Sequence, residues 1–333
     1  MTAAQRRVTL VCLIALLMLA SRPAAAYLNL SEDVRGQVVR LKWNTTPRWF
    51  ASNRSIPRVS ASDFQAAVAR AFATWQAVPT ASLSLQFVGF TSAAPFEDDG
   101  ISVLGFESRP ELERVLGATD FVIDTVTGEI VESDIFFNSA FEWSVAPGGT
   151  SAAFDLQSVA THEIGHFLGL GHSALGETET NPEGGRRVLA SGAVMFPIAF
   201  GRGNTADREL QPDDIAGISD LYPASAFRAR TGVLRGRVRR NGQPVFGAHV
   251  IAFNPATGES IGGFALGADG DFQIAGLTPG PHVVRVEPLD DADVESFFDR
   301  GVDTNFAVTF YERLFVAPAG GVGEHIDVGV RPK

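Results

Sequence analysis

Cysteine is nearly absent from this chain, whose 333 residues include a single one, Cys12. That residue lies in an N-terminal apolar run with the layout of a cleaved leader, so the mature chain would contain neither a thiol nor a disulfide. A thiolate nucleophile is therefore excluded, and so is a cysteine that masks a metal ion. The length predicts about two domains, which can form cores without disulfides.

Long hydrophobic runs are also scarce. Residues 8–20 form a run of 13 residues after Arg6 and Arg7, and the small residues 24–26 precede Tyr27. A membrane span needs about 20 apolar residues, so this pattern favours a secretory signal peptide over residues 1–26 rather than an anchor. No second long run follows. We therefore expect no integral membrane segment after signal cleavage, and a secreted or periplasmic location.

Positive charge is in short supply as well. The full chain has 27 basic and 38 acidic residues, and removal of Arg6, Arg7 and Arg22 with the leader leaves 24 against 38, a net charge of −14. This excess of acid argues against nucleic acid or an anionic membrane as a partner.

Residues 27–223 combine helical and strand patterns. Apolar residues recur at helical spacing through 64–75, and Ser62 with Gln65 resembles a capping box at the start of that helix. Two further helices are predicted at about 156–168, with Asp155 as N-cap, and at about 212–221. Alternating patterns predict strands at 38–43, 83–87, 101–106, 121–124 and 130–137, the last two as a hairpin.

The composition changes after residue 223. We predict a linker at 224–230 and an all-β region at 231–333, because short apolar runs there are separated by Gly and Pro turns. The predicted strands are 233–238, 248–253, 272–274, 283–286, 306–310 and 326–330, which favours a small β-sandwich. The fold class is therefore α+β, followed by a β-sandwich.

Three of the six histidines fall within residues 162–172. His162 and His166 are four residues apart, so one face of a helix presents both imidazoles to a single ion. Glu163 lies about 100° around that helix and can reach a metal-bound water without being a ligand. Gly169 permits a sharp turn after the helix, so His172 can approach the metal from another direction. Three protein ligands leave the fourth position of a zinc ion open for water.

A helix whose histidines are satisfied by local hydrogen bonds is the alternative interpretation. A bare HExxH can arise by chance in a sequence of this length, but the extended form with Gly169 and His172 is far more specific. The pattern therefore predicts one catalytic zinc site, with His162, His166 and His172 as ligands and Glu163 as catalytic base.

These residues resemble the metzincin clan of zinc peptidases and, within it, the matrixin (matrix metalloproteinase-like) family. Ser173 follows the third histidine as in matrixins. The segment 191–197 resembles the clan's Met-turn, which implies that Met195 lies beneath the zinc, although ordinary core packing of Met195 is the alternative. Residues 212–222 resemble the family's closing helix. The resemblance covers about residues 36–223 and implies a twisted mixed sheet with three helices.

Three departures limit what the resemblance implies. His172 and Met195 are 23 residues apart, a longer separation than is usual in the family, so we expect an inserted loop near the cleft. The stretches 116–119 and 134–137 lack the histidines of the animal enzymes' structural zinc site, so we expect no second zinc. The short segment after Tyr27 contains no cysteine switch. The pattern looks more like a bacterial matrixin.

Calcium is a further candidate cofactor. Asp98, Asp99, Asp120, Asp124 and Asp134 lie in or near predicted loops. These carboxylates either bind calcium or lie in solvated turns without an ion. The sequence does not decide between the two interpretations, and we assign no calcium ligand.

The C-terminal region resembles a carboxypeptidase regulatory-like domain, a transthyretin-like β-sandwich. The likeness rests on residues 232–238, 244–250, 269–274 and 276–280, in that order. Such a domain implies a fold and says little about function.

The leading hypothesis is a secreted zinc endopeptidase acting on protein or peptide substrates. By family resemblance, an extended peptide would pair with an edge strand near residues 115–124. Residues 174–190 and 197–209 are expected to line the specificity pocket. One alternative is a zinc-stabilised secreted protein whose sandwich binds a surface or glycan, and another is a zinc hydrolase of non-peptide substrates. The sequence leaves the oligomeric state unknown.

Overall fold

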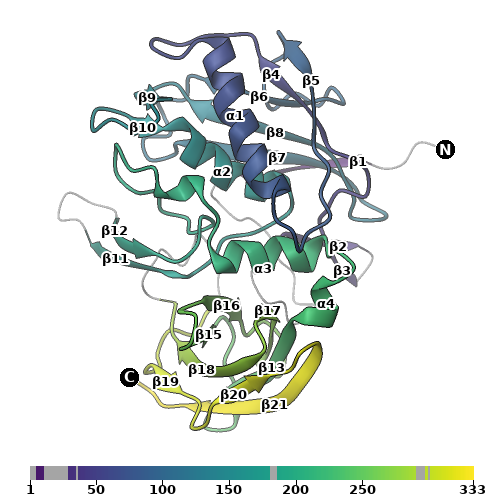
Figure 1. Ribbon diagram of the computed structural model, residues 1–333, viewed down its shortest axis with the longest axis vertical. Coiled ribbons are helices and arrows are strands. Elements are labelled where there is room, and N and C mark those ends of the chain that lie inside the picture. Colours follow the sequence, from purple (N-terminus) through teal and green to yellow (C-terminus); the bar gives the residue numbers. More distant parts are fainter. Residues whose placement is uncertain (1–4, 11–28, 35–36, 181–185, 290–296, 299–300) are drawn as a thin grey trace.

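The computed structural model describes residues 5–10, 29–34, 37–180, 186–289, 297–298 and 301–333. A sheet covered by helices forms one end of the molecule and a β-sandwich forms the other, with helix α3 between them (Figure 1). Among the described residues, no helix is both long and apolar enough to cross a bilayer. The predicted order of an α+β region followed by an all-β region is confirmed.

The N-terminal region is built on a sheet in the order β1-β7-β8-β6-β4-β5. Strand β7 runs antiparallel to both neighbours, and the remaining strands run parallel to one another. Strands β6 and β8 are buried along nearly their whole length, and in β8 this burial includes the polar residues Glu132, Ser133 and Asp134. The bounds are β4 Arg48–Ser52, β5 Gln86–Thr91, β6 Ser102–Glu107, β7 Gly117–Asp124 and β8 Ile130–Asn138.

The outer edge of β7 pairs with β1, Gln5–Leu10, in antiparallel register. These six residues belong to the predicted signal peptide, and the rest of that segment, together with Tyr27, lies outside the described residues. Short strands β2 (Ser31–Val34) and β3 (Gln37–Arg40) pair with each other rather than with the main sheet. The strand predicted at 38–43 therefore ends earlier than expected, and β4 was not predicted.

Helix α1, Ala61–Gln76, packs one stripe of side chains between the sheet and helix α2, Leu156–Phe167. The Phe72 ring stacks on Trp49 of β4 at 4.6 Å and meets Phe167 of α2 edge-on at 5.4 Å. The indole N–H of Trp75 donates to the Thr161 carbonyl oxygen at 2.8 Å, which fixes the distance between the two helices. Such aromatic burial dominates the energy of a core.

The N-cap of α2 is Asp155, as predicted, and its carboxylate accepts the Ser158 N–H. The capping-box prediction for α1 was wrong. Ser60 is the N-cap and accepts the Asp63 N–H at 3.1 Å, so Ser62 lies inside the first turn. Serine is a favourable N-cap residue at either position, so the local sequence does not distinguish Ser60 from Ser62 as the first residue outside the helix.

The predicted inserted loop after His172 contains a two-stranded hairpin, β11 (Gly176–Thr180) and β12 (Arg186–Ser191). A single 3₁₀ turn, η1 (Ala206–Arg208), precedes α3 (Pro212–Leu221), which has the predicted bounds. Strands β9 (Trp143–Ser144) and β10 (Phe154–Asp155) form a small parallel pair before α2.

Two sheets form the C-terminal sandwich. In one, β13 pairs with β14, β17 and β21, and in the other the order is β16-β15-β18-β19, with β20 also pairing with β18. Strands β14, β16 and β20 were not predicted. The segment predicted as a linker contains a helical turn, α4 (Phe227–Arg230). The bounds are β13 Gly232–Arg240, β14 Gln243–Pro244, β15 His249–Phe253, β16 Ser260–Phe264, β17 Asp271–Leu277, β18 Gly280–Glu287, β19 Thr309–Phe310, β20 Phe315–Ala317 and β21 Gly321–Val330.

A buried carboxylate holds the loop between β5 and β6. Asp134 of β8 is 1% exposed, and its two oxygens accept the backbone N–H groups of Phe96 at 2.6 Å and Val103 at 2.7 Å. Asp124 and Asp99 likewise accept backbone N–H groups in their own turns. Asp120 also accepts a backbone N–H, that of Phe121 at 2.8 Å, so four of the five acids considered for calcium are hydrogen-bonded to the backbone.

We predict that Asp134→Ala destabilises the protein by roughly 1–3 kcal/mol for each buried N–H group left without an acceptor. Urea unfolding measures this loss, and Asp98→Ala, at an exposed position of the same loop, is the matched control. Equal unfolding midpoints for the two variants would contradict the role assigned to Asp134.

Candidate metal centre

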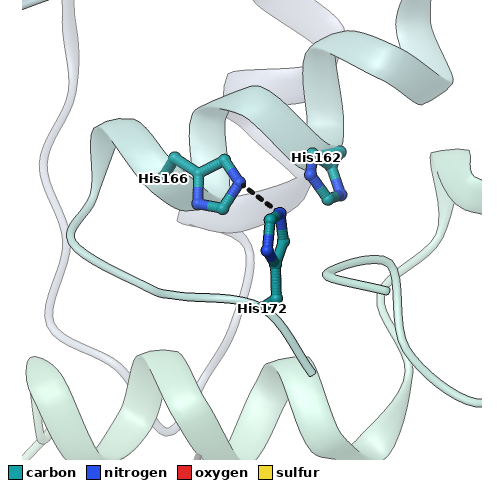
Figure 2. A group of neighbouring side chains, drawn as sticks. All are labelled: His162, His166 and His172. Carbon is teal, nitrogen blue, oxygen red and sulfur yellow. Dashed lines mark hydrogen bonds between the residues drawn. The ribbon is translucent and has the colours of Figure 1, made fainter. Parts of the chain in front are cut away.

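The three predicted histidine ligands come together in one place. His162 and His166 project from α2 toward His172, which extends from the loop that follows the helix (Figure 2). One ring nitrogen from each lies within 4.8 Å of the others, and the Nε2 atoms of His166 and His172 are 3.2 Å apart. Tetrahedral zinc with three imidazole ligands requires this kind of convergence.

Hydrogen bonds fix the orientation of two of the rings. Nδ1 of His162 lies 2.7 Å from the Val194 carbonyl oxygen, and Nδ1 of His166 lies 2.8 Å from that of Leu170. A carbonyl oxygen can only accept, so each Nδ1 carries the proton and donates it. Both Nε2 atoms then keep a lone pair for a metal.

Burial favours the neutral form of these imidazoles. It lowers the pKa of His162, and it lowers that of His166 well below the ordinary value, where repulsion from His172 and His162 adds to the effect. Neutral imidazole is the form that binds metal, so His162 and His166 are prepared for a cation near pH 7.

The turn after α2 depends on Gly169. Its φ is +99°, and a Cβ atom at this position would lie 2.2 Å from the Leu41 carbonyl oxygen. The Gly169 and Leu170 N–H groups donate to carbonyl oxygens of the last helical turn, at 2.6 and 3.0 Å. Only glycine combines this backbone conformation with such a close approach, and the turn redirects the chain so that His172 faces the helix.

Glu163 lies against strand β7. Thr119 donates its hydroxyl to the Glu163 carboxylate at 2.7 Å, and a Cβ on Gly117 would lie 3.2 Å from the Glu163 side chain. Burial raises the pKa of this carboxyl to about 7, while the Thr119 hydrogen bond acts in the opposite direction. A carboxyl with such a pKa can accept and return a proton near neutral pH.

Met195 packs against helix α2 at Gly165, in the core beside the histidine-bearing helix. Its sulfur occupies the space that a side chain at Gly165 of α2 would need, since a Cβ there would lie 2.2 Å from Sδ. The two oxygens of Asp214 in α3 accept the N–H groups of Val194 and Met195 at 2.8 and 3.1 Å. Because the Val194 carbonyl oxygen holds His162, this carboxylate supports a predicted ligand through one intermediate residue.

Sequence reasoning missed Thr119, Asp213 and Asp214. Thr119 is a single residue in a strand and carries no motif. The two aspartates lie in the helix predicted at about 212–221 and were given no role in the site, but both are buried. Burial raises the pKa of Asp213 to about 7 and that of Asp214 to about 6, against hydrogen bonds that act to lower both. The signal available in the sequence for Asp213 and Asp214 was the pair of adjacent acidic residues at the start of a helix with an apolar stripe.

Two family models match the chain. Residues 42–180 match the model described as Matrixin, and residues 233–298 match the Carboxypeptidase regulatory-like domain. The first range contains all three histidines and Glu163, and it ends before Met195. Both resemblances predicted from the sequence are therefore confirmed.

Metalloendoproteinases are among the curated relatives. Metalloendoproteinase 1-MMP of Arabidopsis thaliana is 29% identical over 195 residues, covering 54% of this chain and 44% of that protein. Metalloendoproteinase 1 of Glycine max is 30% identical over 196 residues, 53% of each chain. Human Matrilysin is 35% identical over 89 residues, 27% of this chain and 26% of that one. The chain thus spans about half the length of the plant proteins it matches.

We predict that Gly169→Ala weakens metal binding and destabilises the fold by more than about 1 kcal/mol, because the new methyl group meets the Leu41 carbonyl oxygen at an unfavourable φ. Zinc titration and thermal unfolding measure the two effects. Gly192→Ala is the control, since its Cβ would meet only ordinary contacts, the nearest at 3.4 Å. A Gly169→Ala protein that binds zinc as tightly as the control would contradict this account of the turn.

Proposed function

We propose that this chain, with its matrixin-like domain, is a secreted zinc endopeptidase that hydrolyses peptide bonds in proteins. The observation that carries the proposal is the convergence of His162, His166 and His172 beside a buried carboxyl group, Glu163. The three imidazoles fit zinc, and a site with three protein ligands keeps one position open. A closed structural site would need a fourth protein ligand.

The residues around the proposed ion have separate tasks. Zinc, when bound, supplies Lewis-acid polarisation and lowers the pKa of a coordinated water toward about 7. Glu163 takes a proton from the attacking water and delivers it to the leaving amine. Thr119 holds the Glu163 carboxylate in place through its hydroxyl hydrogen bond.

Strand β7 is the proposed docking edge for the substrate backbone. One of its edges is paired with β8, and the other already holds an extended antiparallel strand, β1. Thr119 of this strand contacts Glu163 directly, which places the edge next to the proposed base. Removal of residues 1–26 would take away β1 and free the edge for a substrate peptide.

The two alternatives differ in what the site does. A zinc-stabilised binding protein has no use for a buried carboxyl with a pKa of about 7 next to a ligand. A zinc hydrolase of non-peptide substrates would keep the centre but would not need an edge strand. The match to metalloendoproteinases also favours the peptidase.

We expect Glu163→Gln to keep its zinc and lose at least about a hundredfold in the rate of cleavage, because the amide cannot take up the proton. Cleavage of an unfolded casein-type protein and metal analysis of the purified variant test the two parts. A 1,10-phenanthroline-type chelator should abolish cleavage by the unsubstituted protein, and added zinc should restore it.

Glu324→Gln is the matched control for the Glu163 variant, because this glutamate is exposed on β21 of the sandwich, outside the metal centre. It should retain cleavage. Full activity in Glu163→Gln would eliminate the proposed mechanism. A zinc-loaded protein that cleaves no polypeptide would favour the alternatives.

Secretion gives a separate prediction. Expression of the full chain in a bacterial host should yield an extracytoplasmic protein whose N-terminal residue is Tyr27, because residues 24–26 form the small-residue cleavage site. Edman sequencing or intact mass measures this. A protein retained in the cytoplasm with residues 1–26 still attached would contradict the signal-peptide prediction.

A further inference from the structure

The outer face of one sandwich sheet packs against the peptidase region. Alternation along β15 and its register with β16 place Ile251, Gly262 and Phe264 on the same face, pointing away from the sandwich core. These positions are nevertheless buried. Ile251 clusters with Leu175 and Ala193, residues that flank the hairpin β11–β12. The sheet therefore covers the segments that follow His172 and lead to Met195.

A buried hydrogen-bond chain crosses this interface. The Gly262 N–H of β16 donates to Oδ1 of Asp213 at 2.8 Å, and the Ser173 hydroxyl donates to Oδ2 of the same carboxyl at 2.6 Å. Ser173 directly follows the predicted ligand His172, and its own N–H donates to the Met195 carbonyl oxygen at 2.9 Å. Asp213 thus connects the sandwich to the backbone that carries the third histidine.

Aromatic side chains of the sandwich region reach the histidine itself. The Phe297 ring, fully buried, meets the His172 imidazole nearly edge-on, with ring centroids 5.9 Å apart. Phe297 in turn packs on Phe264 of β16 at 5.8 Å. His172 is therefore flanked by two histidines on one side, with centroids 4.7 and 5.4 Å away, and has Phe297 as a further ring neighbour.

The glycine in β16 permits this arrangement. A Cβ on Gly262 would lie 2.7 Å from Nε2 of His249 and 3.4 Å from Leu175, so it would push against the interface. Without a side chain, the Gly262 backbone comes close enough for its N–H to reach Asp213. Glycine lowers the intrinsic β-propensity of the strand at this position, but it allows the strand to contact the peptidase region.

We infer that the C-terminal sandwich is a working part of the metal centre: Phe297 positions the third ligand, His172, and the contact of Gly262 with Asp213 fixes the turn that carries it. This inference rests on the proposed zinc site and assigns the sandwich a role in ligand positioning. Groups around a metal ligand commonly change metal affinity by about 10–100-fold when removed.

The test compares zinc affinities of full-length variants by competition with a chelating dye. Phe297→Leu and Gly262→Ala should each weaken zinc binding by about tenfold or more. Phe315→Leu is the matched control for the first, because Phe315 is also fully buried but lies in the sandwich core. Gly329→Ala controls for the second, since a Cβ there would have no neighbour within 4 Å.

Weaker zinc binding in the two interface variants, with the controls near the unsubstituted protein, supports the inference. Unchanged zinc affinity in Phe297→Leu and Gly262→Ala overturns it, and so does an equal loss in Phe315→Leu, because general loosening of the sandwich would then explain the effect. A protein that binds zinc tightly but cleaves no polypeptide would refute the proposed function and leave this comparison intact.

Discussion

The turn at Gly169 is the constraint on which the rest of the site depends. A single helix can bring His162 and His166 to one ion, but no residue further along the same helix can supply a ligand from the opposite direction. The backbone must leave the helix abruptly, and at Gly169 it does so at positive φ while packed on the Leu41 carbonyl oxygen. This contact ties the third ligand to the segment between β3 and β4, so the metal centre and the fold around it are mutually dependent.

Two buried carboxyl groups hold the other backbone segments of the metal centre in place. Asp214 fixes the backbone of Val194 and Met195, and Asp213 joins the chain after His172 to the sandwich. Each accepts hydrogen bonds from groups that would otherwise be buried without partners. These hydrogen bonds offset part of the free-energy cost of desolvating the two acids, and they hold the backbone at Val194 and the chain that follows His172 in place. The metal centre is thus supported from helix α3 and, through it, from the second region of the chain.

The sequence alone predicted the features that depend on local periodicity and on dense motifs. The helices around Phe72, His162 and Asp214 and the hairpin of β7 and β8 follow from patterns within a few residues. Strand β16 was missed because its two consecutive glycines have low β-propensity, and the packing of the N-terminal region against Gly262 became visible only in the structure. Thr119 and Phe297 were missed for a related reason: each acquires its role from a residue more than 40 positions away, which no single-sequence pattern reports.

The central claim is that three histidines and no other protein side chain hold a catalytic zinc. Anomalous diffraction from crystals of the mature protein, recorded on both sides of the zinc absorption edge, tests it most directly. The account predicts one strong peak about 2.0–2.1 Å from a ring nitrogen of each of His162, His166 and His172, with the fourth position taken by solvent. A peak coordinated by a fourth protein side chain, or no zinc at these histidines in protein prepared with zinc, would contradict it.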